Sequence, residues 1–118
     1  MEEGMKYSKN IVERLEMLEK EFNIDDLNIS VFKGYTSDGY YSIDIIGEVI
    51  GECIDSDLIV AITVCNENEE IIGVNFSENI NADSFEGIHT FSQSVEVASG
   101  EEISKVRVYL LKDPSAIW

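Results

Sequence analysis

Six side chains in two polar segments carry the oxygen ligands that calcium prefers in proteins. They are Asp55, Asp57, Asn79, Asn81, Asp83 and Glu86. If successive strands are antiparallel, both segments return to the same end of the domain, where carboxylate and amide oxygens would gather. No spacing among them matches an EF-hand loop. The sequence therefore leaves two interpretations open, a calcium site or solvated turns that hold no ligand.

Catalytic chemistry finds little support in the residue types. The single histidine, His89, stands beside Ile88 and Phe91 in an expected strand, and a Ser–His–Asp or Cys–His site would have to use it. The chain has no glycine-rich phosphate loop, no His-Glu-x-x-His pair and no nucleophile elbow. We therefore expect a protein that is not an enzyme, with no catalytic residues and no cofactor.

The two cysteines, Cys53 and Cys65, have no zinc-site spacing. If the chain between them is a hairpin that turns at Asp55–Asp57, Cys65 lies about six positions beyond the residue opposite Cys53. At roughly 3.3 Å per residue, that separation is too long for a disulfide. We expect two unpaired thiols.

The charge of the chain restricts its partners. Asp and Glu number 24 and Lys and Arg number 8, which gives a formal net charge of −16, and residues 34–104 contain no Lys or Arg. Nucleic acids and anionic membranes bind through Lys and Arg, so we expect neither as a partner. The charge suits a basic protein or cations, and its simplest role is solubility. With no membrane-spanning apolar run and no secretory signal, the expected location is the cytoplasm.

The candidate turn at Asp55–Asp57 lies between the two most regular apolar patterns. From Tyr41 to Cys53 the odd positions are apolar or glycine and the even positions include most of the polar residues, which predicts a strand with one buried face. Gly47 and Gly51 on that face indicate a bulge or the close approach of another element, such as a helix. Leu58–Cys65 is apolar on both sides and predicts a central strand that is covered on both faces.

The remaining pattern predicts a mainly β fold. Further strands are expected at Leu27–Phe32, Ile71–Phe76, Ile88–Val97 and Ile103–Leu111, with a turn at Asp38-Gly39. Before them, Ser8–Phe22 has the apolar spacing of an amphipathic helix. We predict an antiparallel, immunoglobulin-like β-sandwich of six to seven strands preceded by that helix, with a half-open barrel or an α+β fold as the alternative. The expected organisation is a helix and connector at residues 1–26, a sandwich at 27–113 and a tail at 114–118.

Part of this pattern resembles the bacterial FxLYD-type domains, which are immunoglobulin-like sandwiches of unknown function. Gly47-Glu48-Val49 is similar to the first strand of that family, and Gly87–Ser92 is similar to a later strand with glycine followed by Phe-Ser. Ile62–Asn66 stands at the name-giving motif, with Ile, Val, Cys and Asn in place of Phe, Leu, Tyr and Asp. The resemblance covers residues 41–111, implies an immunoglobulin-like sandwich and carries no catalytic residues.

Three functional hypotheses follow. The first is a non-enzymatic protein–protein interaction module that uses a sheet face or edge, either for a partner or for self-association. The second is an acidic inhibitor of a basic protein, of the kind that immunity proteins represent. The third is a calcium-binding β-sandwich. We favour the first, because Leu58–Cys65 is apolar on both sides and the expected helix must dock on something.

Overall fold

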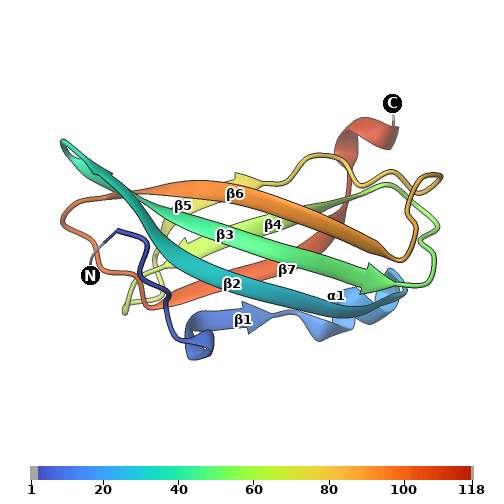
Figure 1. Ribbon diagram of the computed structural model, residues 1–118, viewed down its shortest axis with the longest axis horizontal. Coiled ribbons are helices and arrows are strands. Elements are labelled where there is room, and N and C mark those ends of the chain that lie inside the picture. The colour runs from blue at the N-terminus through green and yellow to red at the C-terminus, as the bar shows by residue number, and fades with distance from the viewer. Residues whose placement is uncertain (1–2, 118) are drawn as a thin grey trace.

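The computed structural model describes residues 3–117, within which the chain forms seven strands, one short α-helix and two 3₁₀ helices (Figure 1). The first part consists of η1 (Lys9–Ile11), β1 (Val12–Arg14), α1 (Glu16–Glu21), β2 (Ile24–Ser37) and β3 (Tyr40–Gly51). The second part consists of β4 (Leu58–Cys65), β5 (Ile71–Phe76), β6 (Ile88–Ala98), β7 (Lys105–Lys112) and η2 (Pro114–Ile117).

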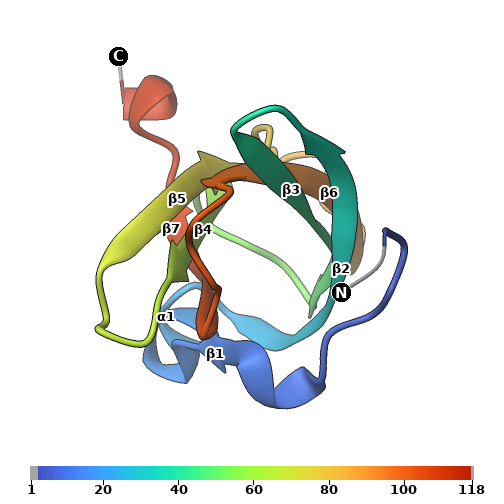
Figure 2. The same ribbon diagram turned by 90° about the vertical axis from the view of Figure 1, so that its left-hand side faces the viewer.

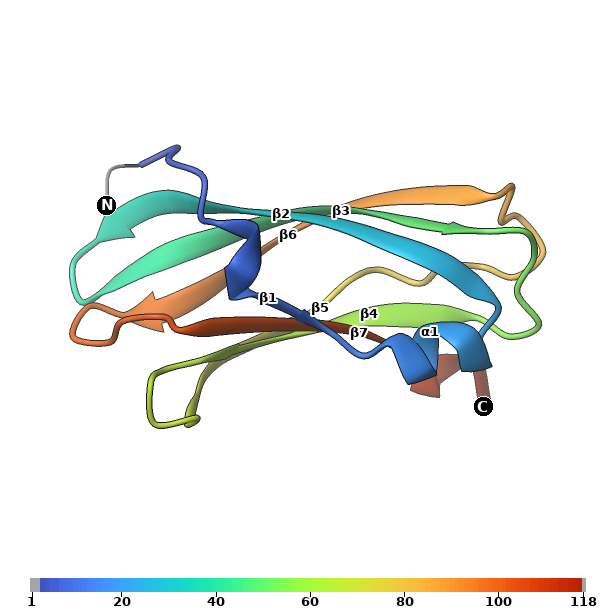
Figure 3. The ribbon, with the colours of Figure 1, turned by 90° about the horizontal axis from the view of Figure 1, so that it is seen from below.

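The strands form two sheets that pack face to face, which confirms the predicted mainly β sandwich (Figure 3). One sheet has the order β2-β3-β6 and the other the order β1-β7-β4-β5. All pairs are antiparallel except β1 with β7, which is parallel. The inward side chains of β3, β4 and β7 are fully buried and form the centre of the core, including Ile43, Ile45, Ile62, Val64 and Val108.

A short N-terminal helix is present, but its predicted extent over Ser8–Phe22 is wrong. Residues Val12–Arg14 are extended, because they pair with Val106–Val108 at the edge of the four-stranded sheet. The helix α1 begins only after this strand. It ends before Asn23, which has a φ of 62°, a left-handed conformation that asparagine tolerates.

The hairpin expected from Tyr41 to Cys65 is also wrong. β3 pairs with β2 and β6, whereas β4 pairs with β7 and β5 in the other sheet. The segment 52–57 therefore crosses from one sheet to the other at one end of the sandwich. The alternation within β3 is as predicted, since its odd positions from Tyr41 to Gly51 are buried, but Cys53 beyond the strand is exposed.

The two glycines of β3 mark close approaches, as predicted, although no helix is the neighbour. A Cβ at Gly47 would lie 2.5 Å from Cζ of Phe91 and 2.7 Å from Cδ1 of Ile29. A Cβ at Gly51 would lie 2.7 Å from the carbonyl oxygen of Asn23. Side chains at these positions would collide with the core or with the chain that leaves α1.

Two potentially open edges are covered by the chain itself. Along β2, the N–H of Tyr7 donates to the carbonyl of Val31 at 2.8 Å, so the N-terminal segment lies against this strand. On the other side, β5 meets β6 across the two sheets, as Figure 2 shows. There Asn75 Nδ2 donates to the carbonyl of Ser94 at 2.8 Å, and Asn75 Oδ1 accepts from the N–H of Phe76 at 2.8 Å. These bonds use edge groups that another strand would otherwise pair with.

The strands extend from Val12 to Lys112, so β1 and the start of β2 come from the part of the chain expected to be helix and connector. Residues 114–117 form η2 beyond β7, and Trp118 lies outside the described residues. No helix in residues 3–117 is both long and apolar enough to cross a membrane.

Candidate interaction surface

The central strand β4 is covered on its outward side as well as on its inward side. Its inward residues belong to the core and have no exposed surface: Leu58, Val60, Ile62 and Val64. On the outward side, the exposed fractions are only 1% for Ala61 and 4% each for Thr63 and Cys65. Small side chains in the middle of a sheet are covered in this way when larger neighbours stand on both sides.

Those neighbours are set by the strand register. Ala61 lies between Tyr109 of β7 and Phe76 of β5, and Thr63 lies between Arg107 and Val74. We call the outward side of these three strands the β4 face. It consists of Ile59, Ala61, Thr63 and Cys65 from β4, Ile71, Val74 and Phe76 from β5, and Lys105, Arg107, Tyr109 and Leu111 from β7.

The prediction that β4 is a central strand covered on both faces is confirmed, but on the outward side, among the described residues, the cover consists of neighbouring side chains of β5 and β7 and not of a helix packed on the sheet. Within residues 3–117, α1 packs against β2 and β7 at the edge of the sandwich. For the described part of the chain, Figures 2 and 3 show no helix or strand packed over the outer side of β4 and β5, and η2 lies beyond the end of β7. The β5 residues Ile71, Val74 and Phe76 are therefore 63%, 49% and 48% exposed. Contiguous exposed apolar side chains of this kind are typical of protein interaction sites.

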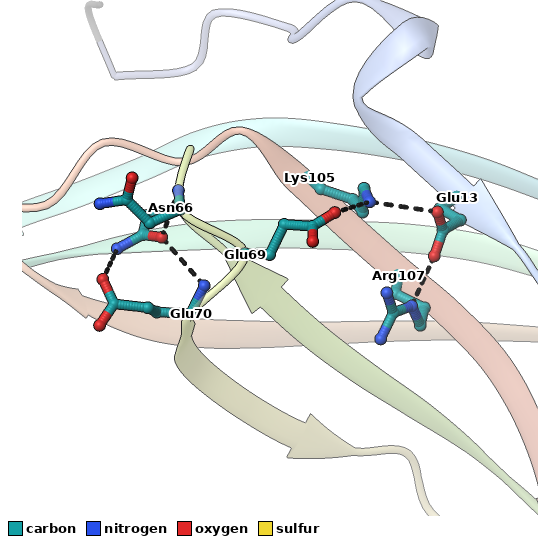
Figure 4. Close-up of polar contacts among 7 residues, drawn as sticks. Glu13, Asn66, Glu69, Glu70, Lys105 and Arg107 are labelled. Atoms are coloured by element: carbon teal, nitrogen blue, oxygen red, sulfur yellow. Dashed lines mark hydrogen bonds and ion pairs between the residues drawn. The ribbon is translucent and has the colours of Figure 1, made fainter.

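One corner of the β4 face carries a network of paired charges (Figure 4). Arg107 Nε donates to Glu13 Oε1 at 2.6 Å, and Lys105 Nζ lies 3.3 Å from Glu13 Oε2 and 3.7 Å from Glu69 Oε1. The hydrogen bond from Arg107 is the main cause that lowers the pKa of Glu13 below its ordinary value. Two basic and two acidic side chains therefore neutralise one another in this corner, beside the apolar centre.

The turn between β4 and β5 adds further carboxylates at the same end. Asn66 holds this turn, because its Oδ1 accepts from the N–H of Glu70 at 3.0 Å and its Nδ2 donates to Glu70 Oε1 at 3.1 Å. The same Nδ2 lies 3.1 Å from Glu101 Oε2, which belongs to the loop after β6. Glu67, Glu69 and Glu70 are exposed. This end of the β4 face is therefore bordered by carboxylates.

At the opposite end, the structure brings together several of the calcium candidates. Asp57 Oδ1 accepts from the N–H of Ala82 at 2.9 Å, and Asp57 Oδ2 accepts from Asn79 Nδ2 at 3.2 Å. Asp55 and Asp83 line the same surface pocket, of about 520 Å³. The prediction that the two polar segments share one end of the sandwich is confirmed.

These oxygens already have partners within the chain, and the amide of Asn79 presents N–H donors to them. Asp55 Oδ2 accepts from Asn23 Nδ2 at 3.3 Å, Asn81 Oδ1 accepts from the N–H of Asp83 at 2.8 Å, and Glu86 is exposed in the loop. In the described part of the chain, no three acidic, histidine or cysteine side chains converge as metal ligands. These hydrogen bonds order the turns at this end of the sandwich from within the chain.

Asp113 is the residue at this end that the sequence analysis missed. It is 7% exposed, accepts from Asn79 Nδ2 at 2.6 Å, and accepts from the N–H and the hydroxyl of Ser115 at 2.9 and 2.7 Å. The bond from Asn79, followed by those from Ser115, lowers the pKa of Asp113. The signal was the order Asp-Pro-Ser after a strand, since Asp before Pro is typical of a helix N-terminus.

The other candidate residues do not form a site. Both cysteines are free: Cys53 is exposed in the crossover segment and Cys65 is buried in β4. The prediction of unpaired thiols therefore agrees with the structure, although the hairpin from which it was derived does not exist. His89 lies in β6 opposite Val49, half-buried. Neither a family model, nor a curated protein, nor a solved structure matches this chain.

Proposed function

We propose that this protein is a non-enzymatic protein–protein interaction module and that the β4 face is its binding surface. The observation that supports this most strongly is the outward side of β4 and β5. The β4 side chains there are small and closely covered, and the β5 side chains beside them are apolar and about half exposed. An interface needs such an apolar centre, which loses water when a partner packs on it.

The form of the surface favours binding by a face over binding by an edge. Asn75 occupies edge groups of both β5 and β6, so neither strand offers a free ladder to an incoming strand there. The β4 face remains as the extended apolar surface. Within this proposal the chain is an immunoglobulin-like domain of the FxLYD type and acts in the cytoplasm.

A photo-reactive residue on each sheet tests the proposal. p-Benzoyl-phenylalanine at Val74 probes the β4 face, and the same residue at Ile46 is the matched control, because these side chains are 49% and 45% exposed on opposite sheets. Irradiation in the cells that make the protein should give a discrete protein adduct from position 74 and little from position 46. Equal yields, or no adduct from position 74, would refute an interaction through this face.

A further inference from the structure

The acidic borders at the two ends of the β4 face identify the kind of partner that fits it. This inference rests on the proposed function and concerns the chemistry of the partner. The first end is the turn with Glu67, Glu69 and Glu70, and the second is the group around Asp57, in which Asp55, Glu78 and Asp83 are exposed and Asp113 is buried. β4 joins the two ends, and its eight residues at roughly 3.3 Å each separate them by about 26 Å.

The size of the apolar centre makes these ends part of any stable interface. Three strands spaced by about 4.8 Å, with eight residues in β4, six in β5 and eight in β7 at roughly 3.3 Å each, give a footprint of roughly 350 Å². A standard interface buries about 800 Å² on each partner. A partner that packs on the β4 face must therefore extend over one or both borders, and its own charges there decide the affinity.

The positively charged side chains of the β4 face do not neutralise the acidic borders at its two ends. Lys105 and Arg107 are already paired with Glu13 and Glu69. Lys112 is an exposed positive charge at the second end, where it lines the pocket with Asp57 and Asp113. Carboxylates outnumber it there. A partner that reaches either end thus meets net negative charge.

A second copy of this chain fits the face poorly for the same reason. When two sheets pack in an aligned manner, their strands run nearly parallel or antiparallel. In the parallel case each border would lie over the same border of the other copy, and in the antiparallel case it would lie over the opposite one. Both cases place carboxylates against carboxylates, and each copy carries a formal net charge of −16.

We propose that the β4 face binds a basic protein, whose apolar patch packs on β4 and β5 and whose Lys and Arg residues contact the two acidic borders about 26 Å apart. The borders steer and orient this partner, and the apolar centre holds it. This arrangement agrees with the hypothesis of an acidic inhibitor, since covering a basic surface with such a face would block it.

Charge variants of the photo-reactive protein test this proposal. The probe is p-benzoyl-phenylalanine at position 74 of the purified chain, added to a dialysed extract of the source cells. Glu67→Gln with Glu78→Gln removes one charge from each border, at side chains that make no hydrogen bond or ion pair within residues 3–117. The matched control is Asp38→Asn with Glu52→Gln, which removes one exposed charge from each end of the other sheet.

The two variants carry the same net charge, so only the position of the charges differs. The border variant should reduce the affinity measured by adduct yield about tenfold, the effect of two exposed ion pairs, and the control variant at most about twofold. The yield should fall as NaCl rises from 50 to 300 mM, and the protein attached at position 74 should have an excess of Lys and Arg.

The contrary results are distinct. Equal losses in both variants, an adduct that salt strengthens, a partner with an excess of Asp and Glu, or an adduct of two copies of this chain would each overturn the basic partner. Those results would leave the β4 face as a binding surface. No adduct at all from position 74 would instead remove the proposed function, and with it this inference.

Discussion

The outer faces of the two sheets differ in the polarity of their side chains. On the three-stranded sheet the outward positions of β2, β3 and β6 are largely polar, and they bond to one another: Asn28 Nδ2 donates to Glu48 Oε1 at 3.1 Å, and Ser94 Oγ donates to Asp44 Oδ1 at 2.8 Å. On the four-stranded sheet the outward side chains of β4 and β5 are mostly apolar. The exposed apolar residues of the first sheet, Tyr35, Ile46 and Ile88, lie on three different strands and are ordinary for a protein surface, whereas a contiguous group is not.

Within residues 3–117, the outer face of the four-stranded sheet shows that side chains can be buried from solvent without another helix or sheet packed on them. Ala61 is as buried as a core residue, although α1 packs against β2 and β7 at the edge of the sandwich. Its cover consists of its neighbours on β5 and β7. The apolar surface that a partner could remove from water therefore lies on β5, where Ile71, Val74 and Phe76 are about half exposed beside the buried centre of β4.

The largest expected effect on stability comes from a charged side chain at the buried outward position Ala61 of β4. Ala61→Asp should reduce the free energy of unfolding by roughly 2–4 kcal/mol, because the short carboxylate cannot reach water between Tyr109 and Phe76. Ser92→Asp adds the same charge to an exposed outward position of the other sheet and should change it by less than about 0.5 kcal/mol. Urea unfolding of both variants measures the contrast, and equal losses would mean that the β4 face is not covered.

The next effect concerns binding. With the photo-reactive residue at position 76, Val74→Ser should reduce adduct yield by about fivefold, because it removes half-exposed apolar area from the centre of the proposed interface. Ile46→Ser removes an equally exposed side chain from the other sheet and should leave the yield unchanged. A similar loss of adduct yield in both variants would mean that the two sheet faces contribute equally to binding.

A smaller effect is expected where the two sheets meet. Asn75→Ala removes the bonds to the carbonyl of Ser94 and to the N–H of Phe76, and should reduce the free energy of unfolding by about 1–2 kcal/mol. It also frees edge groups, so we expect the variant to aggregate more readily in light scattering. Asn28→Ala, which loses a single exposed bond to Glu48, is the control and should do neither.

The smallest effect is the pH dependence of the charged corner. The pKa of Glu13 is lowered in the folded protein, chiefly by Arg107, so the ion pair contributes stability above the ordinary value of 4.5 and loses it as pH falls through the lowered pKa. Glu13→Gln should cost a few tenths of a kcal/mol at pH 7, as exposed pairs do, and the difference from the unmodified protein should shrink as the pH falls below 4.5 and vanish below the lowered pKa. Urea midpoints at pH 7, 5 and 3 check this. A constant difference at all three would contradict an ionic contribution.

The sequence predicted individual strands better than their arrangement. The positions of β5, β6 and β7 agree with the expected segments to within two residues, because alternation and polar turns are local signals. Alternation also identified the buried side of β3. It does not report which strand lies beside which, so the separation of β3 and β4 into two sheets was missed, although the six residues between them allow either arrangement.

The helix prediction for the N-terminal segment was wrong for a related reason. The spacing of Ile11, Leu15, Leu18 and Phe22 fits one side of a helix, but Val12–Arg14 pair with a strand that lies more than 90 positions later in the chain. That contact, and with it the pairing of Glu13 with Arg107, has no local signature. For the β4 face, the sequence revealed a strand that is apolar on both sides. Whether the outer side is open depends on where the helix docks, and only the structure shows that.

The most direct measurement is a scan of p-benzoyl-phenylalanine over exposed positions of both sheets. Ile71, Val74 and Phe76 report on the β4 face, and Ile46, Thr90 and Ser92 report on the other sheet. We predict adducts with a basic protein from all three positions of the first set and none above background from the second. Adducts spread evenly over the two sets, or confined to the second, would contradict binding through the β4 face.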